Sequence, residues 1–164
     1  MCGVAYMFEF KNNDKSTIKL SLKAEIEVYR MKIGTYFDDY EFACSCHRHE
    51  QDGLGHNVLD HIIDKRLVDL LDAIRERIGQ PITVNSGYRC EAHNEEVGGV
   101  SNSQHCLGTA ADITYGGVDV DYLAQVAEEC ASDLGIEGGI GIYYHQDFVH
   151  VDVRGYTARW DDLD

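Results

Sequence analysis

Hydrophobic and polar residues alternate along an early stretch of the chain, which predicts a long β-strand. Apolar residues occupy every second position over residues 18–28, with lysine, serine and glutamate between them. Because successive side chains of a strand point to opposite faces, this pattern is typical of a strand with one buried face. A second apolar run, residues 4–10, precedes it across a polar segment. We therefore expect residues 1–33 to form a β-hairpin ahead of a main domain of residues 34–164.

Later in the chain the apolar spacing changes to three or four residues, which predicts helices. Gly79 and Pro81 are stop signals at the end of the first such stretch. The expected helices are residues 57–78, 91–97 and 120–134, and the expected strands are 82–85, 109–114, 139–144 and 148–153. Together they indicate an α+β fold with helices packed on a mostly antiparallel sheet.

The chain is strongly acidic, with 14 Lys and Arg against 29 Asp and Glu and a net charge of −15. This charge argues against a nucleic-acid partner and against an anionic membrane surface, because both need a basic face. Residues 1–8 lack the basic segment and long apolar stretch of a secretory signal. We therefore expect synthesis in the cytoplasm without a signal peptide, and neither a nucleic-acid nor a membrane partner.

Three residues far apart in the sequence form a candidate set of zinc ligands. Asp112 lies in an apolar strand, where a carboxylate is costly to bury unless it is paired or bound to metal. His105 follows a polar loop, and His150 shares its strand face with Asp152. Two imidazoles and one carboxylate suit a catalytic zinc ion that keeps a position open for water. Spacing alone leaves a purely structural role open for each residue.

Three separate segments resemble the zinc D-alanyl-D-alanine carboxypeptidase family. The pattern Ser-x-His-x-x-Gly-x-Ala-x-Asp matches residues 103–112, Ser-Gly-Tyr-Arg matches residues 86–89, and His-x-Asp-x-x-His matches residues 145–150. The resemblance covers roughly residues 37–160 and points to the carboxypeptidase-like and phage-associated members. It implies the small α+β fold that this family shares with the hedgehog signalling domain, in agreement with the pattern of elements.

The resemblance also implies roles for the matched residues. His105, Asp112 and His150 would bind one catalytic zinc ion, and Asp147 would be the catalytic carboxylate. A carboxylate near the metal can take a proton from water and return it to the leaving amine. Since Asp147 lies three residues before His150, it must lie in a turn to reach the metal. The alternative is that Asp147 only caps that turn.

Further matched residues would act on the substrate. Arg89 would bind the substrate carbonyl or the oxyanion, His145 would assist the transition state, and Ser103 would orient the substrate or a metal ligand. Each residue also has a structural alternative. Arg89 would form an ion pair with Glu91 or Glu95. His145 would be a solvated residue of the turn, and Ser103 would be an ordinary loop hydroxyl.

These features predict a zinc metallopeptidase that hydrolyses peptidoglycan stem peptides at or near D-alanine, as a carboxypeptidase or an endopeptidase of the phage-lysin type. Two alternatives remain open: a non-catalytic, zinc-stabilised binding module of the same fold, and a cytosolic D-Ala-D-Ala dipeptidase. Since bacterial walls are anionic, the charge favours short soluble peptides or a protein partner that positions the enzyme. Residues 1–33 would either pack as an extra edge on the catalytic sheet or form a docking or oligomerisation surface for such a partner.

The six cysteines are too few for a disulfide scaffold. Cys44, Cys46, His47 and His49 are rich in ligand types, but their spacing fits no common zinc motif. A second metal there is therefore an alternative to a loop with incidental thiols. The remaining cysteines of the main domain are expected to be core residues, at positions 90, 106 and 130.

Overall fold

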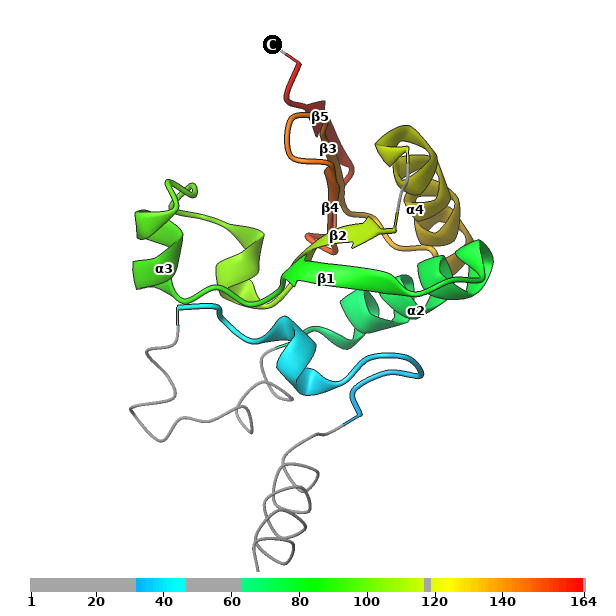
Figure 1. Ribbon diagram of the computed structural model, residues 1–164, viewed down its shortest axis with the longest axis horizontal. Helices are drawn as coiled ribbons and strands as arrows, with labels where there is room; N and C mark the ends of the chain where they lie inside the picture. Colours follow the sequence, from blue (N-terminus) through cyan, green and yellow to red (C-terminus); the bar gives the residue numbers. More distant parts are fainter. Residues whose placement is uncertain (1–31, 47–62, 117–118, 164) are drawn as a thin grey trace, which may run out of the picture.

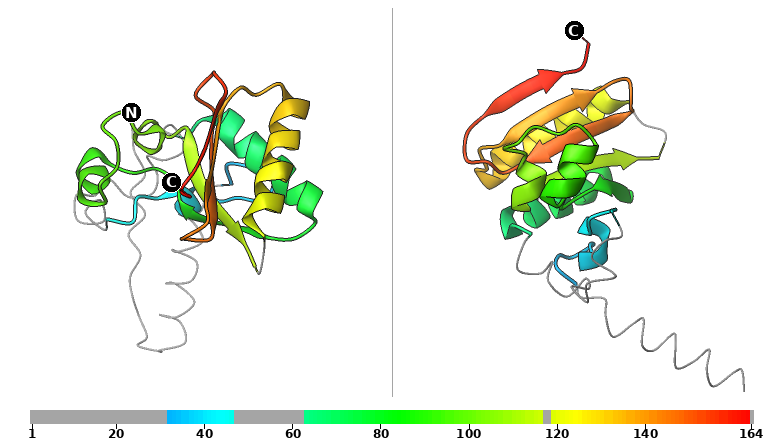
Figure 2. Two further views of the ribbon diagram at one scale, coloured as in Figure 1. Left: turned by 90° about the horizontal axis from the view of Figure 1, so that it is seen from above. Right: turned by 90° about the vertical axis from the view of Figure 1, so that its left-hand side faces the viewer.

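The computed structural model describes residues 32–46, 63–116 and 119–163, so the expected hairpin of residues 1–33 lies almost wholly outside the described residues. Two long helices, α2 (Lys65–Ile78) and α4 (Val120–Leu134), cover one face of a five-stranded sheet (Figure 1). The short helical segments α3 (Glu91–Glu96) and η3 (Gln104–Leu107) lie on the opposite side (Figure 2). The α+β fold predicted from the sequence is confirmed.

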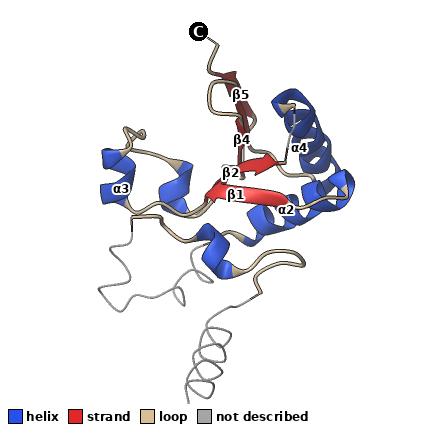
Figure 3. Ribbon diagram, viewed as in Figure 1, coloured by secondary structure: helices blue, strands red, loops and turns tan. Residues whose placement is uncertain are grey.

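The sheet is mostly antiparallel, as expected. Figure 3 shows its first two strands, β1 and β2, pointing in opposite directions. Its strand order is β1-β2-β4-β3-β5, and β5 alone runs parallel to its neighbour, β3. The strand bounds are β1 (Ile82–Ser86), β2 (Ala110–Tyr115), β3 (Gly139–Tyr143), β4 (Phe148–Asp152) and β5 (Ala158–Asp161). Strand β5 was not expected, because its four residues are too few to show a period.

The helix ends are set by side-chain caps and by glycine. Asp64 accepts a hydrogen bond from the backbone N–H of Arg66 at the start of α2, and Gly79 ends this helix in the left-handed conformation, with φ 71°. Since Ile63 and Asp64 precede the helix, the expected continuous helix over residues 57–78 is wrong at its N-terminal end. The bounds expected for α4 are confirmed.

The core lies between the sheet and the two long helices. Ile113, Val149 and Val151 of the central strands are fully buried, and Leu67 and Leu71 of α2 pack in the same cluster. This layer fixes the central strands, whose opposite face carries the polar site described below. Among the described helices, none is both long enough and apolar enough to cross a membrane.

Candidate metal centre and active site

Strand pairing brings two of the three expected metal ligands together. In the antiparallel ladder of β2 and β4, Asp112 lies directly opposite His150. His105 comes from η3, and Gly108 in the left-handed conformation then turns the chain into β2. The N–H of Arg89 donates to the carbonyl of His105 over 3.2 Å, which ties η3 to the segment after β1.

The ligand atoms form a compact triangle. His105 Nε2 lies 3.2 Å from both Asp112 Oδ1 and His150 Nδ1, and the last two atoms are 2.9 Å apart. A tetrahedral ion with ligands at about 2.0–2.1 Å has edges of about 3.3 Å. The three side chains are buried, with exposed fractions of 4–8%. The donor set and its spacing therefore fit one zinc ion.

The other nitrogen of each histidine is held by a hydrogen bond. His105 Nδ1 lies 2.7 Å from the carbonyl oxygen of Gly87, and His150 Nε2 lies 3.1 Å from Asp152 Oδ2. Such bonds select the tautomer whose free nitrogen faces the metal, and they are typical of protein zinc sites. Gly87 is required at its position, because a Cβ there would lie 2.6 Å from the Cα of Phe42.

The charges of the site are strongly coupled. Burial by itself raises the pKa of Asp112, but hydrogen bonds with His105 and His150 outweigh it and hold this pKa well below its usual value. Burial lowers the pKa of His150, yet its bonds to Asp112 and Asp152 leave it raised overall.

Asp152 is a positioning residue that the sequence reasoning missed. Its side chain is fully buried and accepts hydrogen bonds from the N–H of Gly139 over 2.9 Å and from Arg154 Nε over 2.8 Å. Burial raises the pKa of Asp152, but the bonds with His150 and Arg154 lower it well below its usual value. The available signal was its place two residues after His150, on the same strand face.

A cavity of about 620 Å³ opens over the metal-ligand cluster. Arg89 lines it and lies 3.4 Å from Asp112 Oδ2, so its ion pair is with this carboxylate and not with Glu91 or Glu95. Ser103 also lines the cavity and is buried. Arg154 adds a second cation to the wall.

Aromatic rings form another wall of this cavity, which the sequence reasoning did not anticipate. The Trp160 ring lies 5.2 Å from the His150 ring, and its Nε1 donates to Tyr143 Oη over 3.1 Å. Gly141 makes room for it, since a Cβ there would lie 2.2 Å from the indole. Tyr143 stacks on Phe148 with 4.4 Å between ring centroids. Trp160 could not be assigned from sequence because β5 itself was missed.

His145 and Asp147 lie in the turn between β3 and β4, at the border of the cavity. Asp147 is exposed and has a φ of 56°, a left-handed conformation that aspartate tolerates. His145 Nδ1 lies 3.0 Å from Asp162, and its side chain is 68% exposed. Among the described residues of this turn, Gln146 and Phe148 line the cavity, whereas His145 and Asp147 do not.

Three cysteines converge elsewhere in the described part of the chain. The sulfur atoms of Cys44, Cys46 and Cys90 all lie within 4.8 Å of one another. Cys90 is partly exposed, so its expected place in the core is wrong, whereas Cys130 is buried as expected. Cys106 is likewise only partly buried, so its expected place in the core is wrong as well. His47 and His49 lie outside the described residues.

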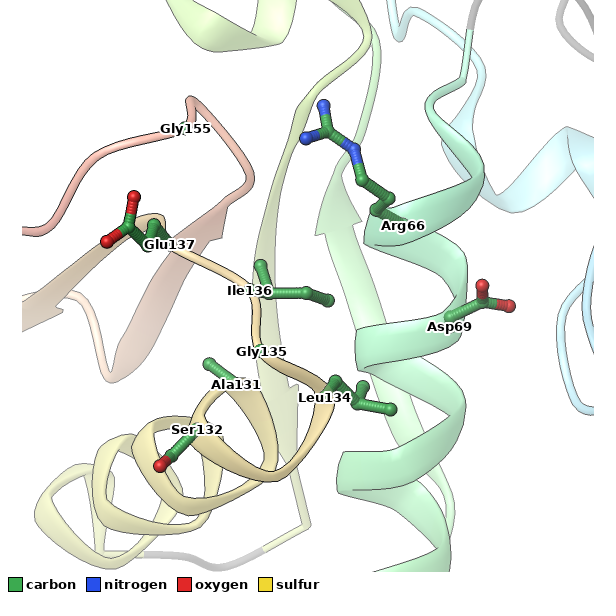
Figure 4. Close-up of a pocket in the computed structure, with 9 residues that line it drawn as sticks. All are labelled: Arg66, Asp69, Ala131, Ser132, Leu134, Gly135, Ile136, Glu137 and Gly155. Atoms are coloured by element: carbon green, nitrogen blue, oxygen red, sulfur yellow. The ribbon is translucent and has the colours of Figure 1, made fainter.

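A second cavity, of about 650 Å³, lies between α2 and the C-terminal end of α4 (Figure 4). Its charged residues on α2 already have close partners: Arg66 pairs with Asp64 and Asp69 with Lys65. None of the three expected metal ligands lines this cavity. It therefore offers no cluster suited to chemistry.

Comparisons with known proteins identify the family of this chain. The zinc D-Ala-D-Ala carboxypeptidase of Streptomyces albus G is 42% identical over 84 residues. The alignment covers 49% of this chain and 31% of that protein, so the chain spans less than a third of the relative's length. The model of a family described as Peptidase M15 matches residues 35–152, from just before the short helical segment η1 (Asp39–Phe42) to the end of β4. Since this match takes in well over half of the chain, the protein belongs to the peptidase M15 family.

Proposed function

We propose that this protein is a zinc-dependent peptidase that cleaves peptidoglycan stem peptides at or near D-alanine. The observation that carries the proposal is the triangle of His105 Nε2, Asp112 Oδ1 and His150 Nδ1, with edges of 2.9–3.2 Å, beneath an open cavity. These three residues would hold the ion. The Streptomyces relative, named as a zinc D-Ala-D-Ala carboxypeptidase, supports this substrate class.

When bound, zinc would supply a Lewis acid that acidifies water and polarises the scissile carbonyl. Arg89 lies beside Asp112 and presents guanidinium donors to the same cavity. It would hold the carbonyl oxygen as negative charge develops there, and losing such a donor typically costs about 10²–10³ in rate. Ser103, which also lines the cavity, would orient the peptide.

Asp147 would take the proton of the attacking water and return it to the leaving amine. Its position next to Phe148, which lines the cavity, supports this role. Because the carboxylate is exposed and does not itself line the cavity, this role requires a change in its side-chain conformation when substrate binds. His145, two residues earlier in the same turn, would assist at the oxyanion.

The cavity favours an anionic peptide end. Two arginines, Arg89 and Arg154, line it in a chain whose net charge is −15. A free α-carboxylate would therefore find two guanidinium groups in this cavity, which supports cleavage near a peptide C-terminus. The aromatic wall would pack against small side chains such as the methyl group of D-alanine.

The test is release of D-alanine from a soluble pentapeptide by the zinc-loaded full chain. Asp147→Ala should lower kcat by about 10²–10⁴ while zinc content stays unchanged. Asp133→Ala is the matched control, because Asp133 is an exposed carboxylate on α4, paired with Arg77 and outside the cavity. Equal activity of the two variants would contradict the role of Asp147. A zinc-loaded wild type with no turnover on pentapeptide, cross-linked peptides or D-Ala-D-Ala would instead indicate a binding module.

A further inference from the structure

The cysteine cluster joins two segments that are distant in sequence. Cys44 and Cys46 follow η1 (Asp39–Phe42), and Cys90 directly precedes α3. The sulfur atoms of Cys46 and Cys90 are 3.7 Å apart, and all three sulfurs lie within 4.8 Å of one another. A disulfide would need about 2.05 Å, so these are separate thiols.

The spacing fits a metal ion bound by sulfur. Zinc binds thiolate at about 2.3 Å, and a tetrahedron of that size has sulfur-to-sulfur edges of about 3.8 Å. The N–H of Cys90 donates to Cys44 Sγ over 3.4 Å, which directs this sulfur to the same centre. All three cysteines are partly exposed, so an ion could enter and keep its fourth position open.

We propose that Cys44, Cys46 and Cys90 bind a second zinc ion, separate from the histidine and aspartate centre. Three sulfur ligands select soft or borderline ions over magnesium or calcium, and three thiolates with one open corner suit tetrahedral zinc. Binding would replace the thiol protons, which pass to solvent. This inference does not rest on the proposed peptidase activity.

The position of the cluster gives the second ion a structural role. Cys90 directly follows Arg89, which lines the cavity and contacts Asp112. The backbone of this segment is already tied to η1, because the N–H of Tyr88 donates to the carbonyl of Phe42 over 2.8 Å. A metal ion that links the segment after η1 to the segment before α3 would restrict their relative movement further. It would thereby hold Arg89 in its place at the cavity.

The experiment counts zinc in the full chain, purified under reducing conditions, by elemental analysis. Wild type should hold two equivalents, and Cys90→Ser and His150→Ala should hold one each. Cys130→Ser is the matched control: it removes a buried thiol on α4 that belongs to neither cluster, and it should keep two. No zinc in His150→Ala, or as much zinc in Cys90→Ser as in wild type, would overturn the proposal.

Cobalt substitution identifies the ligands even if Cys90→Ser folds poorly. Cobalt-loaded His150→Ala should show a sulfur-to-cobalt charge-transfer band in the near ultraviolet, and a thiol-specific mercurial should abolish it. In Cys90→Ser the band should be lost or strongly weakened. Absence of the band in His150→Ala, or a Cys46–Cys90 disulfide in the reduced preparation, would overturn the proposal.

Discussion

Replacement of Asp152 by asparagine should weaken zinc binding although Asp152 is not one of the proposed ligands. Asp152 Oδ2 lies 3.1 Å from His150 Nε2, while Oδ1 accepts from the N–H of Gly139 and from Arg154. In Asp152→Asn, the carbonyl oxygen in place of Oδ1 would keep the bonds from Gly139 and Arg154 Nε. The NH₂ group in place of Oδ2 would face His150 and would lose the bond that Arg154 Nη2 donates to Oδ2. A ring nitrogen that faces a donor must accept, and the proton of a neutral imidazole then sits on Nδ1. Nδ1 is the atom that faces Asp112 and His105, so the ring must give up this favoured tautomer before Nδ1 can bind metal.

Rotating the amide by 180° would not restore a favourable arrangement, because its NH₂ group would then face the donors of Gly139 and Arg154. Loss of a residue that orients a metal-bound histidine typically costs 10- to 100-fold in metal affinity. We therefore expect the zinc Kd to rise by about 10- to 100-fold, or about 1.4–2.7 kcal/mol.

The assay is zinc titration of metal-free protein in competition with a fluorescent chelator. All samples carry Cys90→Ser, so that the cysteine cluster does not contribute. Glu128→Gln is the matched control, since it removes one carboxylate from an exposed ion pair with Arg159 and changes the net charge equally. A folded Asp152→Asn variant with unchanged Kd would refute the tautomer argument, and an equal loss in Glu128→Gln would trace the effect to overall charge.

Three further predictions concern stability and are checked by denaturant or thermal unfolding. Asp64→Ala should destabilise the fold by about 1 kcal/mol through loss of the α2 cap, whereas Asp64→Asn should cost little at neutral pH. The bond from Arg66 lowers the pKa of Asp64 below 3.8 in the folded protein. The carboxylate therefore contributes to the free energy of unfolding above that pH, and this contribution is lost as the pH falls through the pKa of the folded state. A loss of this contribution on raising the pH would contradict the argument. Gly87→Ala should cost about 1–3 kcal/mol, because its Cβ meets the backbone of Phe42, while Gly116→Ala, which has open space, should be close to neutral. Chelation of bound zinc should lower Tm. If free zinc was present at 100 times its Kd before chelation, the free energy of unfolding should fall by about 2.7 kcal/mol. An unchanged Tm would argue against the metal sites.

Much of the fold could be predicted because helices and strands leave a period in the sequence. The apolar stripe of α4 ends at Gly135, and its predicted bounds agree with the structure. The start of α2 was misplaced, because apolar residues continue upstream of the residue that caps the helix. Strand β5 was missed because four residues are too short to show alternation.

Of the site, the sequence by itself determined the ligand types and their spacing, and it placed His150 and Asp152 on one strand face. It could not show that Asp112 faces His150, which depends on the register of β2 against β4. The sequence also could not show that Cys90 lies near Cys44 and Cys46, or that the Trp160 ring lies near His150. Local periodicity follows from backbone geometry, whereas contacts between distant segments depend on how the whole core packs, and only the tertiary structure decides that.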